Sequence, residues 1–552
     1  MKRWKASLVL TLVAAAVLAV GSSPVVASTP DDTRATSTSS SSTSYVPISG
    51  AGSSWSANAI DQWRRNVQQF GMRVNYASTG SSDGRNQFRT GTVDFASSEI
   101  PYGLSDSGVV DTPPSRKFAY MPIVAGGTSL MYNLTVGSQR ITNLRLSGET
   151  VARIFTGDIT SWDDAAIKAD NPGITLPARR IVPVVRSDGS GTTAQLTAWM
   201  ASEHPRIWDA YCARAGRPTP CGQTSNFPVI SGTGFVGQPG SQGVSGYVAQ
   251  RANVGTITYV EYSYAIKTGY PVAKLLNKAG YYVEPTASNV AVSLLGARIN
   301  NDPSSQAYLT QILTGVYRNA DPRTYPLSSY SYLIVPTAVE GNFTTAKGST
   351  LGAFAYYFLC EGQRQAETLG YSPLPINLVK AGLEQVRKIP GVQAQSIDIR
   401  SCKNPTFSSD GTNTLAKNAP MPPECDRRGS TVQCSDGTGG AAEQPTQPGP
   451  GASDGGATDG SGTGTDTGVD GLPVDGGGIG GDGGATGGGP AICEIDTGAC
   501  QTVAAIPVEI ERVDAGWTRE STYMALALIA VLLTALAPPA LARWVRATRS
   551  GS

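Results

Sequence analysis

The stretch IVPVVRSDGSGT, residues 181–192, contains a strand, a turn and the start of a helix in direct succession. The apolar run 181–185 predicts a buried strand, and the glycines at 189 and 191 predict a tight turn. Leu196, Trp199 and Met200 follow at helical spacing. Strand–turn–helix units of this kind are typical of α/β folds with mostly parallel sheets.

The same pattern recurs on the N-terminal side of this stretch. Apolar residues at helical spacing between 60 and 70 end at Gly71, and alternating residues at 74–76 predict the next strand. We expect another strand at 93–96 and a capped helix at 147–155. The chain is therefore predicted to belong to the α/β class, with a folded unit over residues 46–403.

Three glycine- and serine-rich turns precede predicted helices: GAGSSW at 50–55, GSSDG at 80–84 and DGSGT at 188–192. A helix N-terminus has free backbone N–H groups and a partial positive charge. Glycine lets a ligand approach the backbone, and hydroxyls add donors. Arg186 would add one full charge in a geometry suited to an oxyanion. One such turn is typical of an ordinary cap, whereas three together with Arg186 favour an anion site.

The composition argues against several classes of protein. Lys and Arg number 43 against 42 Asp and Glu, a balance that lacks the basic excess of nucleic-acid-binding proteins. The chain has one histidine, His204, and neither a Gly-x-Ser-x-Gly turn nor a Cys-x-x-Cys pair. A serine hydrolase or a zinc site is therefore not indicated. We expect no enzymatic activity, no cofactor, no metal and no nucleic-acid partner.

The two ends of the chain indicate export and anchoring. Residues 1–27 have the basic start, apolar run and small-residue cleavage site of a signal peptide. Residues 523–542 form an apolar run long enough to span a bilayer, and a basic tail, 543–552, follows. The positive-inside rule places this tail in the cytoplasm. We expect a single-pass protein of the cell membrane whose binding domain is extracytoplasmic.

The segments between these ends and the folded unit differ in composition from it. Residues 28–45 are rich in Ser and Thr and predict a disordered lead. Residues 404–490 predict a Gly/Asp-rich flexible linker; within them, 451–490 contain 18 Gly and no Lys or Arg. A small cysteine-containing segment, 491–520, is expected next to the membrane.

Eight cysteines lie in the exported part of the chain, where disulfides persist. An even number fits four bridges, although eight cysteines allow 105 connectivities. Close spacing in the sequence suggests three of the pairs, and the two cysteines that remain would form the fourth. The suggested pairs are Cys212–Cys221, Cys425–Cys434 and Cys493–Cys500, with Cys360–Cys402 remaining.

Six motifs carry a resemblance to a known family. They are GAGSSW, NYASTGSSDG, VDFASSEIP, IFTGDITSWDD, VPVVRSDGSGTT and VGTITYVEYSYA, in matching order and spacing. Over about residues 46–389 the chain resembles the phosphate-binding receptor of the high-affinity phosphate ABC transporter, a periplasmic-binding-protein-like family. The resemblance implies a two-lobed fold, with one lobe at about 46–124 and 333–403 and the other at about 125–332. Crossing strands near 124–129 and 325–333 would form the hinge.

The resemblance also implies a set of site residues. Asp188 matches an acid that orients the arginine, and Glu99 stands where the family has an aspartate that accepts a phosphate O–H. Glu99 is one methylene longer. The residues implied to bind phosphate are Ser54, Trp55, Ser81, Glu99, Arg186, Ser190, Gly191 and Thr192. Trp55 would offer its backbone N–H, and the serines and Thr192 their hydroxyls.

The function implied is that of a membrane-tethered receptor that delivers inorganic phosphate to an ABC-type permease. One alternative is a surface-anchored protein that senses phosphate or another oxyanion, or serves in adhesion, without a transport role. A third, less favoured hypothesis is a phosphoester hydrolase. Stimulated uptake would distinguish the first from the second, and turnover of a phosphate monoester would identify the third.

Overall fold

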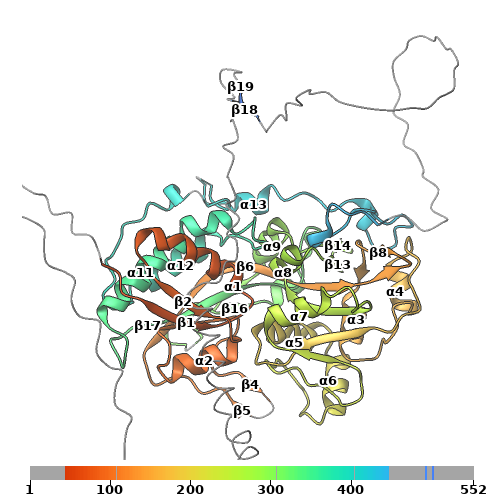
Figure 1. Cartoon of the computed structure of the whole chain (residues 1–552), viewed down its shortest axis with the longest axis horizontal. Coiled ribbons are helices and arrows are strands. Elements are labelled where there is room, and N and C mark those ends of the chain that lie inside the picture. Colours follow the sequence, from red (N-terminus) through yellow and green to blue (C-terminus); the bar gives the residue numbers. More distant parts are fainter. Residues whose placement is uncertain are drawn as a thin grey trace, which may run out of the picture. The chain divides into compact units, whose positions relative to one another are not determined.

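The computed structural model describes residues 44–446, apart from 107, 108, 306, 403 and 409, together with 491–493 and 500–502. The chain divides into two compact units, residues 1–456 and residues 457–552. The first unit contains a large mixed sheet covered by helices (Figure 1). The α/β class predicted from the strand–turn–helix pattern is confirmed.

The central sheet joins two sets of parallel strands through an antiparallel pair. Its main path runs β2-β1-β3-β17-β6-β12-β10-β11. Strand β1 pairs in parallel with β2 and β3, and β10 pairs in parallel with β11 and β12. Between these sets, β17 and β6 pair antiparallel to each other and to their neighbours β3 and β12.

The first lobe is built around the parallel strands β1, β2 and β3. Helix α1 buries Ala59, Ile60 and Trp63 in this core, and Gly71 ends the following turn in a left-handed conformation with φ of 79°. Its elements are β1 (Ile48–Gly52), α1 (Ala57–Asn66), β2 (Val74–Ala77), α2 (Ser81–Arg89), β3 (Phe95–Ser98), β4 (Ser105–Asp106), β5 (Val109–Val110), β17 (Ser328–Pro336), α11 (Thr345–Leu359) and α12 (Ile376–Val386).

The second lobe has its own apolar core, around Trp162, Trp208 and Tyr259. Its elements are β7 (Thr135–Val136), β8 (Gln139–Arg140), β9 (Arg145–Leu146), α3 (Gly148–Phe155), α4 (Ala165–Asp170), β10 (Val182–Arg186), α5 (Gly191–Glu203), α6 (Pro205–Arg214), β11 (Val236–Gln238), α7 (Gly240–Val248), β12 (Thr256–Glu261), α8 (Tyr262–Thr268), β13 (Val272–Leu276) and β14 (Tyr282–Val283).

Strand β6 (Phe118–Asn133) crosses from one lobe to the other (Figure 1). Its first part pairs with β17, from Phe118 opposite Pro336 to Gly127 opposite Ser328. Its last part pairs with β12, from Thr128 to Asn133. The two crossing segments expected near 124–129 and 325–333 thus lie side by side in the middle of the sheet.

One segment that we assigned to the second lobe packs with the first. Val290, Leu294 and Leu313 belong to the apolar core of the first lobe. The expected lobe boundary is therefore wrong for this segment, because the chain returns to the first lobe after β14 and before β17. The segment comprises α9 (Ala287–Leu294), β15 (Arg298–Ile299), β16 (Gln311–Ile312) and α10 (Thr314–Tyr317).

The folded unit also extends past the boundary that we expected at residue 403. Residues 404–446 pack against both lobes and include α13 (Thr414–Lys417). Lys274 and Asp426 form a buried ion pair there, and Thr438 donates to the backbone of the second lobe. The prediction of a flexible linker is therefore wrong for these residues, because they bury polar and apolar groups despite their few strands and helices.

Three of the four predicted disulfides are present: Cys212–Cys221, Cys360–Cys402 and Cys425–Cys434. In the second unit, β18 (Ala491–Cys493) and β19 (Cys500–Thr502) pair antiparallel, with Cys493 opposite Cys500. Their side chains lie outside the described residues, so the fourth disulfide stays a prediction.

Among the described residues, none of the helices has the length and apolar character needed to cross a bilayer. Several predictions fall outside the described residues and stay predictions: the signal peptide 1–27, most of the lead 28–45, the linker from 447 onward, the transmembrane segment 523–542 and the tail 543–552.

Candidate functional site

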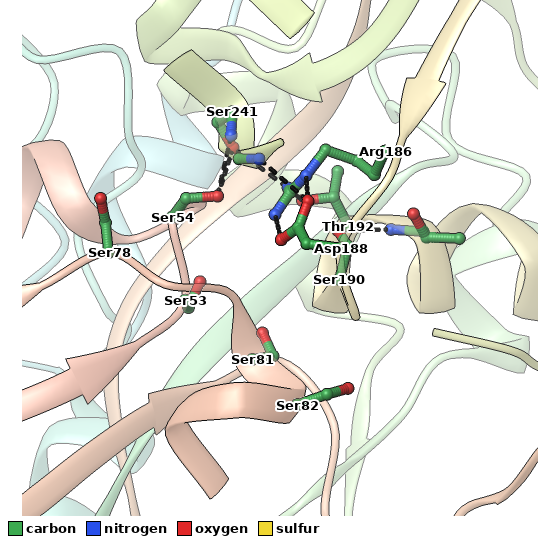
Figure 2. Close-up of polar contacts among 12 residues, drawn as sticks. Ser53, Ser54, Ser78, Ser81, Ser82, Arg186, Asp188, Ser190, Thr192 and Ser241 are labelled. Carbon is green, nitrogen blue, oxygen red and sulfur yellow. Dashed lines mark hydrogen bonds and ion pairs between the residues drawn. The ribbon is translucent and has the colours of Figure 1, made fainter. Parts of the chain in front are cut away.

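Loops from both lobes meet where the parallel strands end at their carboxyl sides. In an open α/β sheet this edge is where ligands bind. Figure 2 shows Ser53, Ser54 and Ser81 of the first lobe opposite Arg186 and Ser241 of the second. The loops follow β1, β2, β10 and β11, so residues far apart in the sequence surround one place.

Four helices begin in these loops. Helix α2 starts at Ser81 after Gly80, and α5 starts at Gly191 after Ser190, as the two turns predicted. Ser190 caps α5 by accepting a hydrogen bond from the backbone N–H of Thr193 at 3.1 Å. Helices α1 and α7 start next to the same site. Their first-turn N–H groups, which have no partner inside the helix, supply donors without net charge.

Hydrogen bonds join the two lobes across the site. The backbone N–H of Ser241 donates to Oγ of Ser54 at 2.9 Å, and the two hydroxyls are also 2.9 Å apart. The backbone N–H of Ser82 donates to the carbonyl of Gly189 at 3.1 Å. Because each bond joins one lobe to the other, the described arrangement is the closed one.

Arg186 is held rigidly by the acid that we expected beside it. Its Nε donates to Oδ1 of Asp188 at 2.7 Å, and its Nη2 bonds Oδ2 of the same carboxylate. Although partial burial opposes ionisation of Asp188, the hydrogen bonds and charge of Arg186 lower its pKa. This leaves Nη1 of Arg186 directed toward Oγ1 of Thr192 and Oγ of Ser241, at 3.4 and 3.5 Å. Asp188 therefore fixes the orientation of the guanidinium in the described structure.

Glu99 follows β3 and is buried on the first-lobe side of the site. Its Oε1 accepts from the hydroxyls of Ser53 at 2.5 Å and Ser331 at 2.7 Å, and its Oε2 accepts from Ser81 at 2.8 Å. Burial raises the pKa of Glu99, although the three hydroxyls and Arg186 oppose the shift. A Cβ at Gly191 would lie 2.0 Å from Oε2, so the carboxyl group lies against the start of α5.

Trp55 is fully buried and packs edge-on against Tyr371, with ring centroids 5.7 Å apart. Its backbone N–H, which we expected to face the ligand, donates to Oγ of Ser53 at 3.0 Å. Its carbonyl accepts from the hydroxyl of Tyr371 at 2.6 Å. Trp55 therefore fixes the path of the chain between β1 and α1, whose turn carries Ser54.

The structure thus brings all of the predicted site residues together, and it adds residues that the sequence interpretation missed. Ser53 and Ser331 hold Glu99, Ser241 contacts Ser54 and Arg186, and Gln195 donates to the carbonyl of Glu99 at 2.8 Å. The sequence could have indicated Ser241 as a site residue, because Pro-Gly-Ser at 239–241 is a fourth glycine–serine turn before a helix. No such sequence pattern indicates Ser331, because it lies within a strand.

The fold and the site together define a two-lobed binding protein. A sequence profile of the PBP superfamily domain matches residues 31–361. Curated relatives at 32% and 31% identity are covered over most of their length by this chain. The chain belongs to the PBP superfamily and, within it, to the PstS phosphate-binding proteins.

Three relatives illustrate the similarity. The phosphate-binding protein PstS of Xylella fastidiosa (strain Temecula1) is 32% identical over 351 residues, 63% of this chain and 87% of the relative. PstS of Methanocaldococcus jannaschii is 31% identical over 357 residues, with the same coverage of 63% and 87%. PstS 3 of Mycobacterium tuberculosis (strain CDC 1551) is 29% identical over 332 residues, 59% of this chain and 82% of the relative. All three are binding proteins and not enzymes.

Proposed function

We propose that this protein is an extracytoplasmic receptor that binds inorganic phosphate between its lobes and delivers it to an ABC-type importer. One observation carries the proposal. Four helices begin around Nη1 of Arg186, the guanidinium nitrogen that does not bond Asp188, and the buried carboxyl group of Glu99 lies next to them. The names of the curated relatives support phosphate as the ligand.

The site suits an oxyanion because its attraction comes from oriented donors. The charge of Arg186 is already balanced by Asp188, so the pair adds no net charge. Backbone N–H groups and hydroxyls at helix starts would hold the anion. Because these donors are buried, we expect binding to depend weakly on salt concentration.

Glu99 supports phosphate over sulfate. At neutral pH phosphate still carries a proton that it can donate to an ionised carboxylate, whereas sulfate does not. A carboxylate facing sulfate would place two acceptors together, an unsatisfied contact that costs about 1–3 kcal/mol. The carboxylate therefore selects by rejecting the wrong anion.

Membrane attachment is part of the same proposal. The apolar run 523–542 and the arginines that follow it would anchor the chain, with the two-lobed unit outside the cell. Residues 447–522 would then form the tether. A flexible chain of this length has a root-mean-square span of about 50 Å, which keeps the receptor near a permease in the same membrane.

Three measurements test the proposal. Calorimetric titration of the purified protein should show one phosphate site and little response to equimolar sulfate; a protein that binds neither anion would refute the phosphate assignment. Cell fractionation should recover the full chain with membranes, whereas a chain ending at residue 446 should appear in the medium and still bind phosphate. Stimulated phosphate uptake in cells would separate a transport receptor from a surface protein that only senses or adheres.

A further inference from the structure

The segment 404–446, which we call the C-terminal strap, contacts both lobes outside the ligand site. It begins beyond residue 361, where the match to the superfamily profile ends. In Figure 1 it runs from α13 toward β14 along the edge of the molecule beyond β6. The strap therefore contacts both lobes, the first through α9 and the second through β13.

The first half of the strap is fastened to the first lobe. The disulfide Cys360–Cys402 holds its start against the end of α11. The side chains of Asn404 and Thr406 both donate to the carbonyl of Leu374, at 3.0 and 2.9 Å. Helix α13 then packs on α9, where Ala416, Ala419, Ala291 and Val292 form a small apolar cluster.

The second half of the strap is fastened to the second lobe. Nζ of Lys274, in β13, donates to Oδ2 of Asp426 at 2.6 Å, and both side chains are almost fully buried. Nη1 of Arg145 donates to the carbonyl of Cys425 at 2.6 Å. The disulfide Cys425–Cys434 closes this part of the strap into a loop. A buried ion pair resists separation, because removing one partner leaves the other buried and unpaired.

A short proline-rich spacer, residues 419–424 with the sequence APMPPE, connects the two fastened halves. Pro423 has φ of −67° and ψ of 152°, the conformation of polyproline II. Chains of this kind are extended and semi-rigid, so they have little slack. Nη1 of Arg323 donates to the carbonyls of Ala416 and Ala419, which fixes the spacer where it leaves the first lobe.

We propose that the strap holds the lobes in the closed arrangement and thereby slows release of the ligand, which on the proposed function is phosphate. In the described structure, each half of the strap contacts its lobe and the hydrogen bonds between the lobes are also present. The contacts of the strap are therefore compatible with the closed arrangement. Opening at β6 and β17 moves the two fastened halves relative to each other. A stiff spacer cannot follow that movement, so opening must break one set of contacts. The apparent affinity rises with the fraction of closed protein.

The test compares full-length chains that differ only in the spacer. The triple substitution Pro420→Gly, Pro422→Gly and Pro423→Gly removes its stiffness, and a Gly-Ser-Gly-Ser insertion after Met421 adds length. Pro420 and Pro423 are exposed and Pro422 is half-buried, and none of the three belongs to an apolar core. The matched control is Met421→Ala, which alters the spacer at an exposed position and keeps all three prolines.

Phosphate release from preloaded protein is measured first. The softened and lengthened spacers should release phosphate at least about threefold faster than the unaltered chain, and the Met421→Ala control should not. Equal release rates in all four proteins would overturn the proposal.

Hydrogen exchange of the ligand-free proteins gives a second readout that needs no phosphate. The N–H groups of Ser82 and Ser241 donate across the lobes, so they exchange only when the lobes separate. Their exchange should accelerate in the two spacer variants alone. If the unaltered chain binds no phosphate, the proposed function fails, and unchanged exchange at these two N–H groups would then overturn the strap proposal independently.

Discussion

Ser54 and Ser241 lie on different lobes, 187 residues apart in the sequence, and meet at 2.9 Å through both a backbone donor and their hydroxyls. Oγ of Ser54 accepts from the N–H of Ser241 and shares a second hydrogen bond with the Ser241 hydroxyl, in which either oxygen can be the donor. Both side chains are buried, and Nη1 of Arg186 lies 3.5 Å from Oγ of Ser241. This contact links lobe closure directly to the donors around the guanidinium.

Replacing Ser241 by alanine should weaken phosphate binding and speed its release. The backbone contact remains, whereas the hydroxyl that meets Ser54 is lost, so a loss of about 2- to 10-fold in affinity is expected from one neutral hydrogen bond. Stopped-flow fluorescence of the buried tryptophans would follow release. Ser245→Ala is the control, because that hydroxyl bonds the carbonyl of Ser241 within α7. Equal effects of the two substitutions would contradict a role in closure.

Replacing Arg186 by alanine should cost more than any single serine substitution in the site. A charged donor contributes about 1.5–3 kcal/mol, which corresponds to a loss of roughly 10- to 150-fold in affinity. Asp188 would also lose its partner, so calorimetric titration should be paired with a melting curve. Arg214→Ala, at an exposed ion pair with Asp158, provides the control. A variant at Arg186 that binds phosphate normally would exclude the guanidinium from the site.

Replacing Glu99 by glutamine should reduce the preference for phosphate over sulfate. The amide can donate to sulfate, whereas the ionised carboxylate cannot. Since burial raises the pKa of Glu99, acidification should also protonate the native side chain and let sulfate compete. We therefore expect sulfate competition to grow as the pH falls in the native protein and to be insensitive to pH in the variant. Identical competition curves would show that Glu99 does not face the anion.

Glu261 should make stability decrease as the pH rises. It ends β12, its Oε2 accepts from the N–H of Ser263 at 2.8 Å, and its buried Oε1 has no hydrogen-bond partner. Burial raises its pKa well above the ordinary value. The folded state therefore holds a proton that the unfolded state has lost, and stability falls as the pH rises from the unfolded pKa of about 4.3 through the folded one.

The substitution Glu261→Gln removes this titration. Melting temperatures measured between pH 5 and 9 should decline less steeply in the variant than in the native protein, and the difference should grow with pH. Glu340→Gln is the control, because Glu340 is only half-buried and its Oε2 accepts from the backbone N–H of Lys117. Parallel pH profiles for the native protein and Glu261→Gln would contradict the assignment.

The helix starts were predictable because their signals are local. Gly80, Ser190 and the apolar spacing after each of them specify a turn and a helix without reference to the rest of the chain. The crossing strands near 124–129 and 325–333 were expected from the resemblance to the family and not from such local signals. By contrast, the position of residues 290–313 in the first lobe depends on which apolar core they reach, and their sequence is compatible with either. Residues 404–446 were misjudged because their stability comes from a disulfide and buried polar pairs rather than from periodic apolar residues.

The sequence by itself determined the α/β class, the family, the glycine–serine turns that begin α2 and α5, and three of the disulfide pairs that the structure describes. These features depend on the spacing and type of residues within short stretches of the sequence. Only the tertiary structure decided that Ser53, Ser81 and Ser331 share the carboxylate of Glu99, that Ser241 meets Ser54, and that the C-terminal strap joins the lobes. Such contacts depend on the packing of distant segments, because a side chain finds its partner only after the whole sheet has formed.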